Sequence, residues 1–199
     1  SGQPINDLNR IANISDRQQR RQLDFLNTLN REHQKSRATN VELESRIRSF
    51  ELAYRMQTAA PEVFDLNRES PATHHMYGLD DQRCAHFGRQ CLYARRMVES
   101  GVRFVQLYSG GTENQKSWDG HVDIEGNHRG FAGEVDQPIA ALLIDLKQRG
   151  LLEETLVVCG GEFGRLPIAQ LESKPGRDHN PNAFTTWFAG GGIKGGISH

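Results

Sequence analysis

The sequence predicts an α/β fold in which a helical N-terminal third precedes a core of helices and short strands. Two observations lead to this prediction. Apolar residues recur at helical spacing in the first third, and beyond residue 82 amphipathic helices alternate with short runs of β-branched and aromatic residues. The 199 residues are enough for one sizeable core. We therefore expect a single α/β segment, with 1–81 as a mainly helical excursion and 82–199 as the helix–strand core.

Two capping boxes mark helix starts in the first third. They pair Ser15 with Gln18 and Thr39 with Glu42, so that each pair satisfies its free backbone amides reciprocally. The second helix should end near residue 60, because Pro61 disfavours the helical conformation in the residue before it. Apolar stripes at helical spacing follow both boxes, and their members are Leu23, Leu26, Leu29, Leu43, Ile47, Phe50 and Tyr54.

The core should contain two further helices and three strands. One helix is predicted over 82–100 and another over 134–149, and each is followed by a glycine that suits a helix C-terminus. A long polar loop over 109–133 separates them. Helices and short apolar strands alternate along this part of the chain, and this order indicates a partly parallel sheet. The strands are expected at 102–108, 155–159 and 184–189.

Composition excludes several classes of partner. The net charge is -1, the pI is about 6.7, and charges of both signs are scattered along the chain, which argues against a nucleic-acid groove. No apolar run approaches the roughly 18 residues that span a bilayer. There are three cysteines and no CxxC pair, so a zinc knuckle is not indicated. Nothing in the sequence specifies an oligomeric state.

The segment TLVVCGGEFGR at 155–165 is the most informative part of the chain. It begins as an apolar strand and ends in two glycines and a carboxylate. Open α/β sheets place their chemistry at the carboxyl ends of strands. Glu162 is therefore a candidate metal ligand or general base, and Arg165 a candidate holder of an anionic substrate. The alternative is an ion pair between these two residues that ties down the loop.

Two acid–imidazole pairs lie in the neighbouring loops. Asp119 and His121 stand two residues apart, so in an extended segment both side chains face the same way. Asp178 and His179 follow the next strand. Carboxylates with imidazoles suit zinc, and also manganese or iron. Each pair has a second interpretation, as a solvated polar loop or a salt bridge. Together at strand ends, they predict a hydrolytic metal site.

An ordered set of segments carries a family resemblance over nearly the whole chain. On these segments the chain resembles the bacterial family catalogued as domain of unknown function 1501, which is abundant in planctomycetes and is similar to the alkaline phosphatase and sulfatase superfamily. The segments are LNREHQ at 29–34, ELESRIRSFELAYRMQTAAPE at 42–62, YGLD at 77–80, CLYARRMVESGVRFVQLY at 91–108, WDGH at 118–121, DLKQRGLLEETLVVCGGEFGR at 145–165 and GRDHNPNAFTTWFAGGGIKGG at 176–196.

The resemblance implies a partial alkaline-phosphatase-like mixed sheet flanked by helices, with a divalent metal at the strand ends. Zinc is the first expectation, and calcium or manganese are alternatives. The resemblance places metal ligands at Asp119, His121, Glu162 and His179. From the residues themselves, Asp178 is a further candidate ligand, and Glu162 and Arg165 are the candidate catalytic residues. The superfamily has an Asp-His pair where this chain has Glu162 and Phe163, and phenylalanine cannot bind a metal.

The resemblance further implies a metal-dependent sulfatase or phosphatase that acts on a small anionic ester or a sulfated glycan in the periplasm or outside the cell. We expect the chain to be an internal segment of a larger domain, inactive alone, because the superfamily places its nucleophile upstream. The alternative is a non-catalytic envelope binding protein with a degraded metal site, which Phe163 favours. A third hypothesis is that the chain is a mostly helical interaction module, and this requires Asp119 and His179 to lie far apart.

Overall fold

The computed structural model describes residues 14–35, 41–110, 117–170 and 173–198. The chain divides into two compact units, Ser1–Leu66 and Asn67–His199. Helices and short strands are both present, which confirms the predicted α/β class. A 3-10 turn at Leu66–Arg68 lies at the division between the units.

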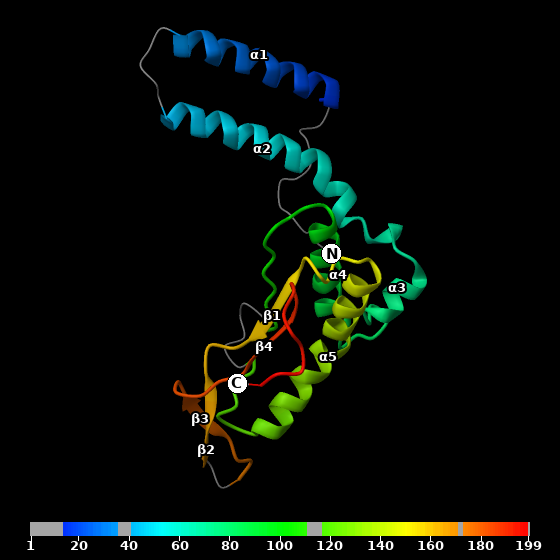
Figure 1. Ribbon diagram of the computed structural model, residues 1–199, viewed down its shortest axis with the longest axis vertical. Helices are drawn as coiled ribbons and strands as arrows, with labels where there is room; N and C mark the ends of the chain where they lie inside the picture. The colour runs from blue at the N-terminus through cyan, green and yellow to red at the C-terminus, as the bar shows by residue number, and fades with distance from the viewer. Residues whose placement is uncertain (1–13, 36–40, 111–116, 171–172, 199) are drawn as a thin grey trace. The chain divides into compact units, whose positions relative to one another are not determined.

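The first unit contains an antiparallel pair of helices, α1 (Asp16–Lys35) and α2 (Val41–Phe64) (Figure 1). The capping box predicted at the start of α1 is confirmed. The Gln18 amide donates to Ser15 Oγ at 3.3 Å, and the Ser15 amide donates to Gln18 Oε1 at 2.9 Å. The second predicted box contains Thr39, which lies outside the described residues.

Polar contacts join α1 to α2. Arg20 Nη1 pairs with Glu51 Oε1 at 2.7 Å, and the Arg20 guanidinium lies 5.0 Å from the centre of the Tyr54 ring. Gln19 donates to Gln57 Oε1 at 2.9 Å. Several residues of the predicted apolar stripes remain about half exposed or more, namely Leu26, Leu29 and Phe50.

The predicted end of α2 near residue 60 is wrong, because the helix continues through Pro61 to Phe64. A proline inside a helix removes one backbone hydrogen bond and bends the axis without ending the helix when neighbouring turns hold it. Figure 1 shows such a bend in the last turns of α2.

The second unit is built on the packing of α4 (Ala85–Glu99) against α5 (Ile124–Gln148), with the short helix α3 (Pro71–Met76) beside α5. The predicted helix ends are confirmed, since Gly101 and Gly150 follow α4 and α5 with positive φ angles of 88° and 72°. The buried core residues are Tyr77, Cys84, Cys91, Leu92, Ala94, Pro138, Ala141, Leu142 and Leu146.

Helix α5 begins ten residues before the predicted start at 134, so part of the expected loop is helical. Its N-cap is Asp123, whose side chain accepts a hydrogen bond from the Gly126 amide at 3.2 Å. Three glycines in the first turns, which lower intrinsic helix propensity, hid this start in the sequence. Packing and the cap outweigh that propensity.

The strands form two antiparallel pairs. β1 (Leu156–Gly160) pairs with β4 (Thr186–Gly190), and β2 (Gly164–Ala169) pairs with β3 (Arg177–Asn180). β1 and β4 lie where strands were predicted, whereas β2 and β3 were expected to be loop. The predicted partly parallel sheet is wrong for the described residues. Residues 102–108 form no strand despite their composition, because strand propensity is realised only through a pairing partner.

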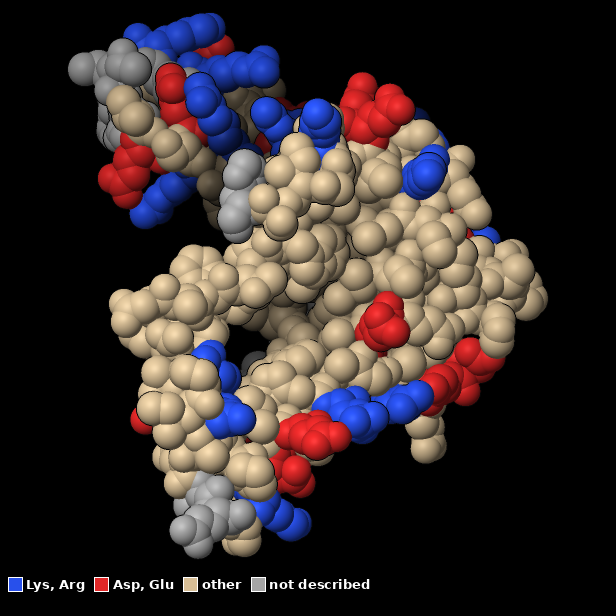
Figure 2. All heavy atoms as spheres, turned by 60° about the horizontal axis from the view of Figure 1, so that its bottom comes forward, with Lys and Arg blue, Asp and Glu red and all other residues tan. Residues whose placement is uncertain are grey.

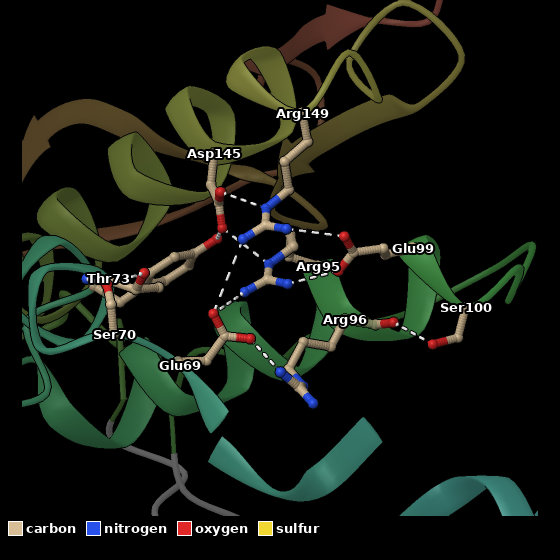
Figure 3. Close-up of polar contacts among 10 residues, drawn as sticks. Glu69, Ser70, Thr73, Arg95, Arg96, Glu99, Ser100, Asp145 and Arg149 are labelled. Carbon is tan, nitrogen blue, oxygen red and sulfur yellow. Dashed lines mark hydrogen bonds and ion pairs between the residues drawn. The ribbon is translucent and has the colours of Figure 1, made fainter. Parts of the chain in front are cut away.

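A buried arginine on α4 lies at the centre of the second unit (Figure 3). The side chain of Arg95 is 1% exposed and meets three carboxylates: Nη2 lies 2.8 Å from Glu69, Nη1 2.7 Å from Glu99 and Nε 2.9 Å from Asp145. The contact with Glu99 has hydrogen-bond geometry, and the other two are ion pairs by distance. These contacts connect α4 with α5 and with the segment before α3.

Further polar groups surround the same carboxylates. Arg149 Nε pairs with Asp145 Oδ1 at 2.7 Å, and the Tyr77 hydroxyl donates to Asp145 Oδ2 at 3.0 Å. Arg96 pairs with Glu69. Burial by itself raises the pKa of the Glu69 carboxyl, but the close guanidinium groups of Arg95 and Arg96 together outweigh it and hold that pKa below its ordinary value of 4.5.

Arg95→Met should lower the free energy of unfolding by about 3–5 kcal/mol, because it leaves buried carboxylates without their central cation. The matched control is Arg129→Met, which removes an exposed i,i+4 pair with Glu125 on α5 and should cost about 0–1 kcal/mol. Urea unfolding measures both variants. Equal losses in the two would contradict a central role for Arg95.

Glu69→Gln should lower the free energy of unfolding at neutral pH, and this destabilisation should disappear in acid. The folded-state pKa of Glu69 is depressed, so its charge stabilises the fold above the ordinary value of 4.5 and that stability is lost as the pH falls through the folded-state pKa. The difference in unfolding free energy between wild type and variant should therefore shrink as the pH falls below 4.5. A difference that stays constant over this range would show that the Glu69 charge is not responsible.

Candidate metal centre

The loop that precedes α5 lies against the β2–β3 hairpin. The Arg177 amide donates to Gly120 O at 2.7 Å, and the Asp123 amide donates to Lys174 O at 3.0 Å. At Gly176 the approach is so close that a Cβ atom would lie 1.8 Å from His121 O, so only glycine fits. These contacts place residues 119–121 directly beside the strand that contains His179.

Trp118 anchors the other side of this loop. It adopts a positive φ of 61°, its indole N–H donates to Ser109 Oγ at 2.9 Å, and its ring lies 5.5 Å from that of Phe131 on α5. These contacts tie the loop to Ser109 and to α5.

Three predicted residues converge at the junction. Asp119, His121 and His179 each offer one ligand atom, and these atoms all lie within 4.8 Å of one another. His121 Nε2 lies 3.0 Å from His179 Nε2 and 3.3 Å from Asp119 Oδ1. Asp119 and His121 are each 32% exposed, so the cluster is open to solvent and to ligands.

The donor set fits a zinc ion. Catalytic zinc sites use three protein ligands, commonly imidazoles and a carboxylate, and leave a fourth position for water or substrate. Tetrahedral zinc with bonds of about 2.0–2.1 Å separates neighbouring ligand atoms by about 3.3 Å. The separations of 3.0 and 3.3 Å around His121 Nε2 are close to this value. The three residues could therefore hold a divalent metal.

Arg165 on β2 fixes the carboxylate of this cluster. Its Nη2 donates to Asp119 Oδ1 at 3.3 Å and to Trp118 O at 3.1 Å, and its Nη1 donates to Arg177 O at 3.1 Å. The side chain is 17% exposed. The guanidinium thus contacts both the loop before α5 and β3. The sequence predicts instead that Arg165 pairs with Glu162 or holds an anionic substrate.

The predicted set of four ligands is reduced to three, because Glu162 lies outside the cluster and its side chain is exposed. The physical reason is the path of the chain between β1 and β2. Phe163 faces the site in its place, with its ring 4.1 Å from the ring of His179. Asp178 also lies outside the three-residue cluster. Its Oδ1 accepts from the His179 amide at 2.7 Å and is 3.9 Å from His121 Nδ1, the nitrogen opposite Nε2.

Sequence reasoning missed Gln170, which contacts the site from the end of β2. Its Oε1 lies 2.8 Å from His121 Nδ1. The sequence contains no signal for this contact, since an isolated glutamine 49 residues from its partner follows no motif. Only the pairing of β2 with β3 and the seating of the loop against them bring the two side chains together.

The face drawn in Figure 2 has no single sign of charge. Lysine and arginine lie on it beside aspartate and glutamate, and wide areas without charged residues separate the groups. Within the described part of the chain, no helix has the length and apolar character needed to cross a bilayer.

Comparison with known proteins identifies one family. The family described as "Protein of unknown function (DUF1501)" matches residues 1–199. No curated protein matches the chain. No solved structure matches it either.

A matched pair of acid-to-amide substitutions distinguishes a metal ligand from a carboxylate that does not bind the metal. Asp119→Asn should weaken zinc binding strongly, because a neutral amide is a far poorer ligand than a carboxylate, whereas Glu162→Gln should leave affinity and stoichiometry unchanged. Calorimetric titration with zinc measures both. Loss of affinity in Glu162→Gln would return this residue to the ligand set, and unchanged binding in Asp119→Asn would remove the cluster as the metal site.

Proposed function

The chain belongs to the DUF1501 family of proteins of unknown function, and from its candidate metal centre we propose that it serves in metal-dependent hydrolysis of sulfate or phosphate esters. The observation that supports the proposal is the convergence of Asp119, His121 and His179, which come from two segments almost 60 residues apart, within 4.8 Å. The likeness of the WDGH and GRDHNP segments to the alkaline phosphatase and sulfatase superfamily adds support.

The ligand set favours zinc over the alternatives. Two imidazoles and one carboxylate suit zinc and manganese, whereas calcium prefers a shell made only of oxygen atoms. When bound, such a metal supplies Lewis-acid polarisation of an ester oxygen and lowers the pKa of a coordinated water. The chain's own contribution is to bring the two imidazoles together and to keep Asp119 in place through Arg165.

The charge of the site supports an anionic substrate. A divalent cation held by one carboxylate and two neutral imidazoles keeps a net positive charge, and Arg165 adds another cation beside Asp119. A small anionic ester or a sulfated glycan is therefore the substrate class we propose. The resemblance also supports an exported or periplasmic location for this activity.

One observation favours a second function, that of a non-catalytic envelope binding protein. The Phe163 ring packs against His179 at 4.1 Å, in the place where the resembled superfamily has a second acid–imidazole pair. An aromatic ring there cannot help bind a second ion. A protein with one metal and no partner ion could bind an anionic ester without cleaving it.

The deciding experiment uses the complete gene product that contains this chain, loaded with zinc and assayed on aryl sulfates, aryl phosphates and sulfated glycans. We expect hydrolysis of at least one class, abolished in His179→Ala and retained in Glu162→Gln. The paired variants ensure that loss of activity reports on the cluster and not on general damage to the loop. Zinc binding without hydrolysis of any ester would support the binding protein, and absence of both would reject the metal centre.

A further inference from the structure

Gln170 occupies a fixed position behind His121. It directly follows Ala169, which pairs with Arg177 across the β2–β3 hairpin, and its backbone amide donates to Gly176 O at 2.9 Å. The backbone at Gln170 is therefore held by the same hairpin that contains His179. From this position its side-chain oxygen reaches His121 Nδ1 at 2.8 Å.

This contact favours the tautomer of His121 with hydrogen on Nδ1, in competition with Asp119 Oδ1, which lies 3.3 Å from Nε2 and favours hydrogen there. The Gln170 oxygen can only accept, so this hydrogen bond requires His121 Nδ1 to donate. A neutral imidazole with hydrogen on Nδ1 has its lone pair on Nε2. That nitrogen is the one that faces Asp119 Oδ1 at 3.3 Å and His179 Nε2 at 3.0 Å. The contact thus directs the metal-binding lone pair toward the other two ligands.

The neighbouring carboxylate cannot perform this task. Asp178 Oδ1 lies 3.9 Å from His121 Nδ1, beyond hydrogen-bond distance, and it already accepts from the His179 amide at 2.7 Å. Without Gln170, either nitrogen of His121 could carry the proton, and a proton on Nε2 would block binding of the metal.

We propose that Gln170 is a positioning residue that fixes the tautomer and the orientation of His121, so that Nε2 is free to bind the metal. This inference rests on the proposed metal centre. Metal-bound imidazoles depend on such a hydrogen bond at their other nitrogen, and its loss costs about 10–100-fold in metal affinity.

The test compares three variants by zinc titration. Gln170→Leu removes the acceptor and should weaken zinc binding about 10–100-fold. Gln170→Glu keeps an acceptor at the same position and should bind zinc at least as well as wild type. Gln90→Leu is the matched control, because Gln90 also contacts a histidine ring, that of His86 at 2.9 Å on α4, outside the site. It should leave affinity unchanged. Equal loss in Gln170→Leu and Gln170→Glu would overturn the proposal.

A second measurement on the metal-free protein separates this inference from the proposed function. Long-range proton–nitrogen NMR should show His121 with hydrogen on Nδ1 in wild type and in Gln90→Leu, and a shift toward hydrogen on Nε2 in Gln170→Leu. The NMR measurement does not require zinc. If wild type fails to bind zinc, the metal centre is rejected, but the tautomer of His121 in wild type and Gln170→Leu still shows whether Gln170 fixes it. Hydrogen on Nε2 in wild type would overturn the proposal.

Discussion

The buried guanidinium of Arg95 is the interaction on which the second unit depends. It extends from α4 to carboxylates on α5, on α4 itself and on the segment before α3. A buried charge is tolerated only when its partners are placed around it, because an unpaired one costs several kcal/mol. The ion pairs of Arg95 with Asp145 and Glu69 tie α5 and the segment before α3 to α4. Figure 3 shows the carboxylates of Glu69, Glu99 and Asp145 arranged around this one group.

The position of α5 in turn determines where the candidate metal centre lies. Its C-terminal turns hold Asp145 beside Arg95, and its N-terminus is capped by Asp123, two residues after His121. The loop with Asp119 is thus attached to the rigid end of a packed helix. A site tied to such an element is held more precisely than one on a free loop.

The second half of the site comes from the β2–β3 hairpin, and Arg165 joins the two halves. Its guanidinium donates to Asp119 and Trp118 in the loop and to Arg177 on β3. The planar fork of arginine, with several donors in fixed directions, is suited to such a bridge, and lysine could not reproduce it. Arg165 was predicted to act on a substrate. In the structure its contacts are with Asp119, Trp118 and Arg177, so it organises the candidate ligand cluster.

The difference between Glu162 and Phe163 illustrates a limit of reasoning from strand ends. The sequence predicted a carboxylate directly after an apolar strand and two glycines, and β1 does end at Gly160. The chain then turns directly into β2, however, and the turn presents Phe163 to His179 while Glu162 is exposed. The residue that faces the site is therefore Phe163, one position after the predicted Glu162.

Local patterns in the sequence determined the features that depend on neighbouring residues. These include the α/β class, the capping box at Ser15, the glycine ends of α4 and α5, and the acid–imidazole pair at 119 and 121, because each follows from chemistry within a few residues. Tertiary structure alone decided the features that need distant partners. Strand pairing was antiparallel, residues 102–108 formed no ladder, and α5 started early because its cap and its packing outweighed three glycines. The contact between Gln170 and His121 spans 49 residues, and no local pattern records it because it exists only when the hairpin and the loop are folded together.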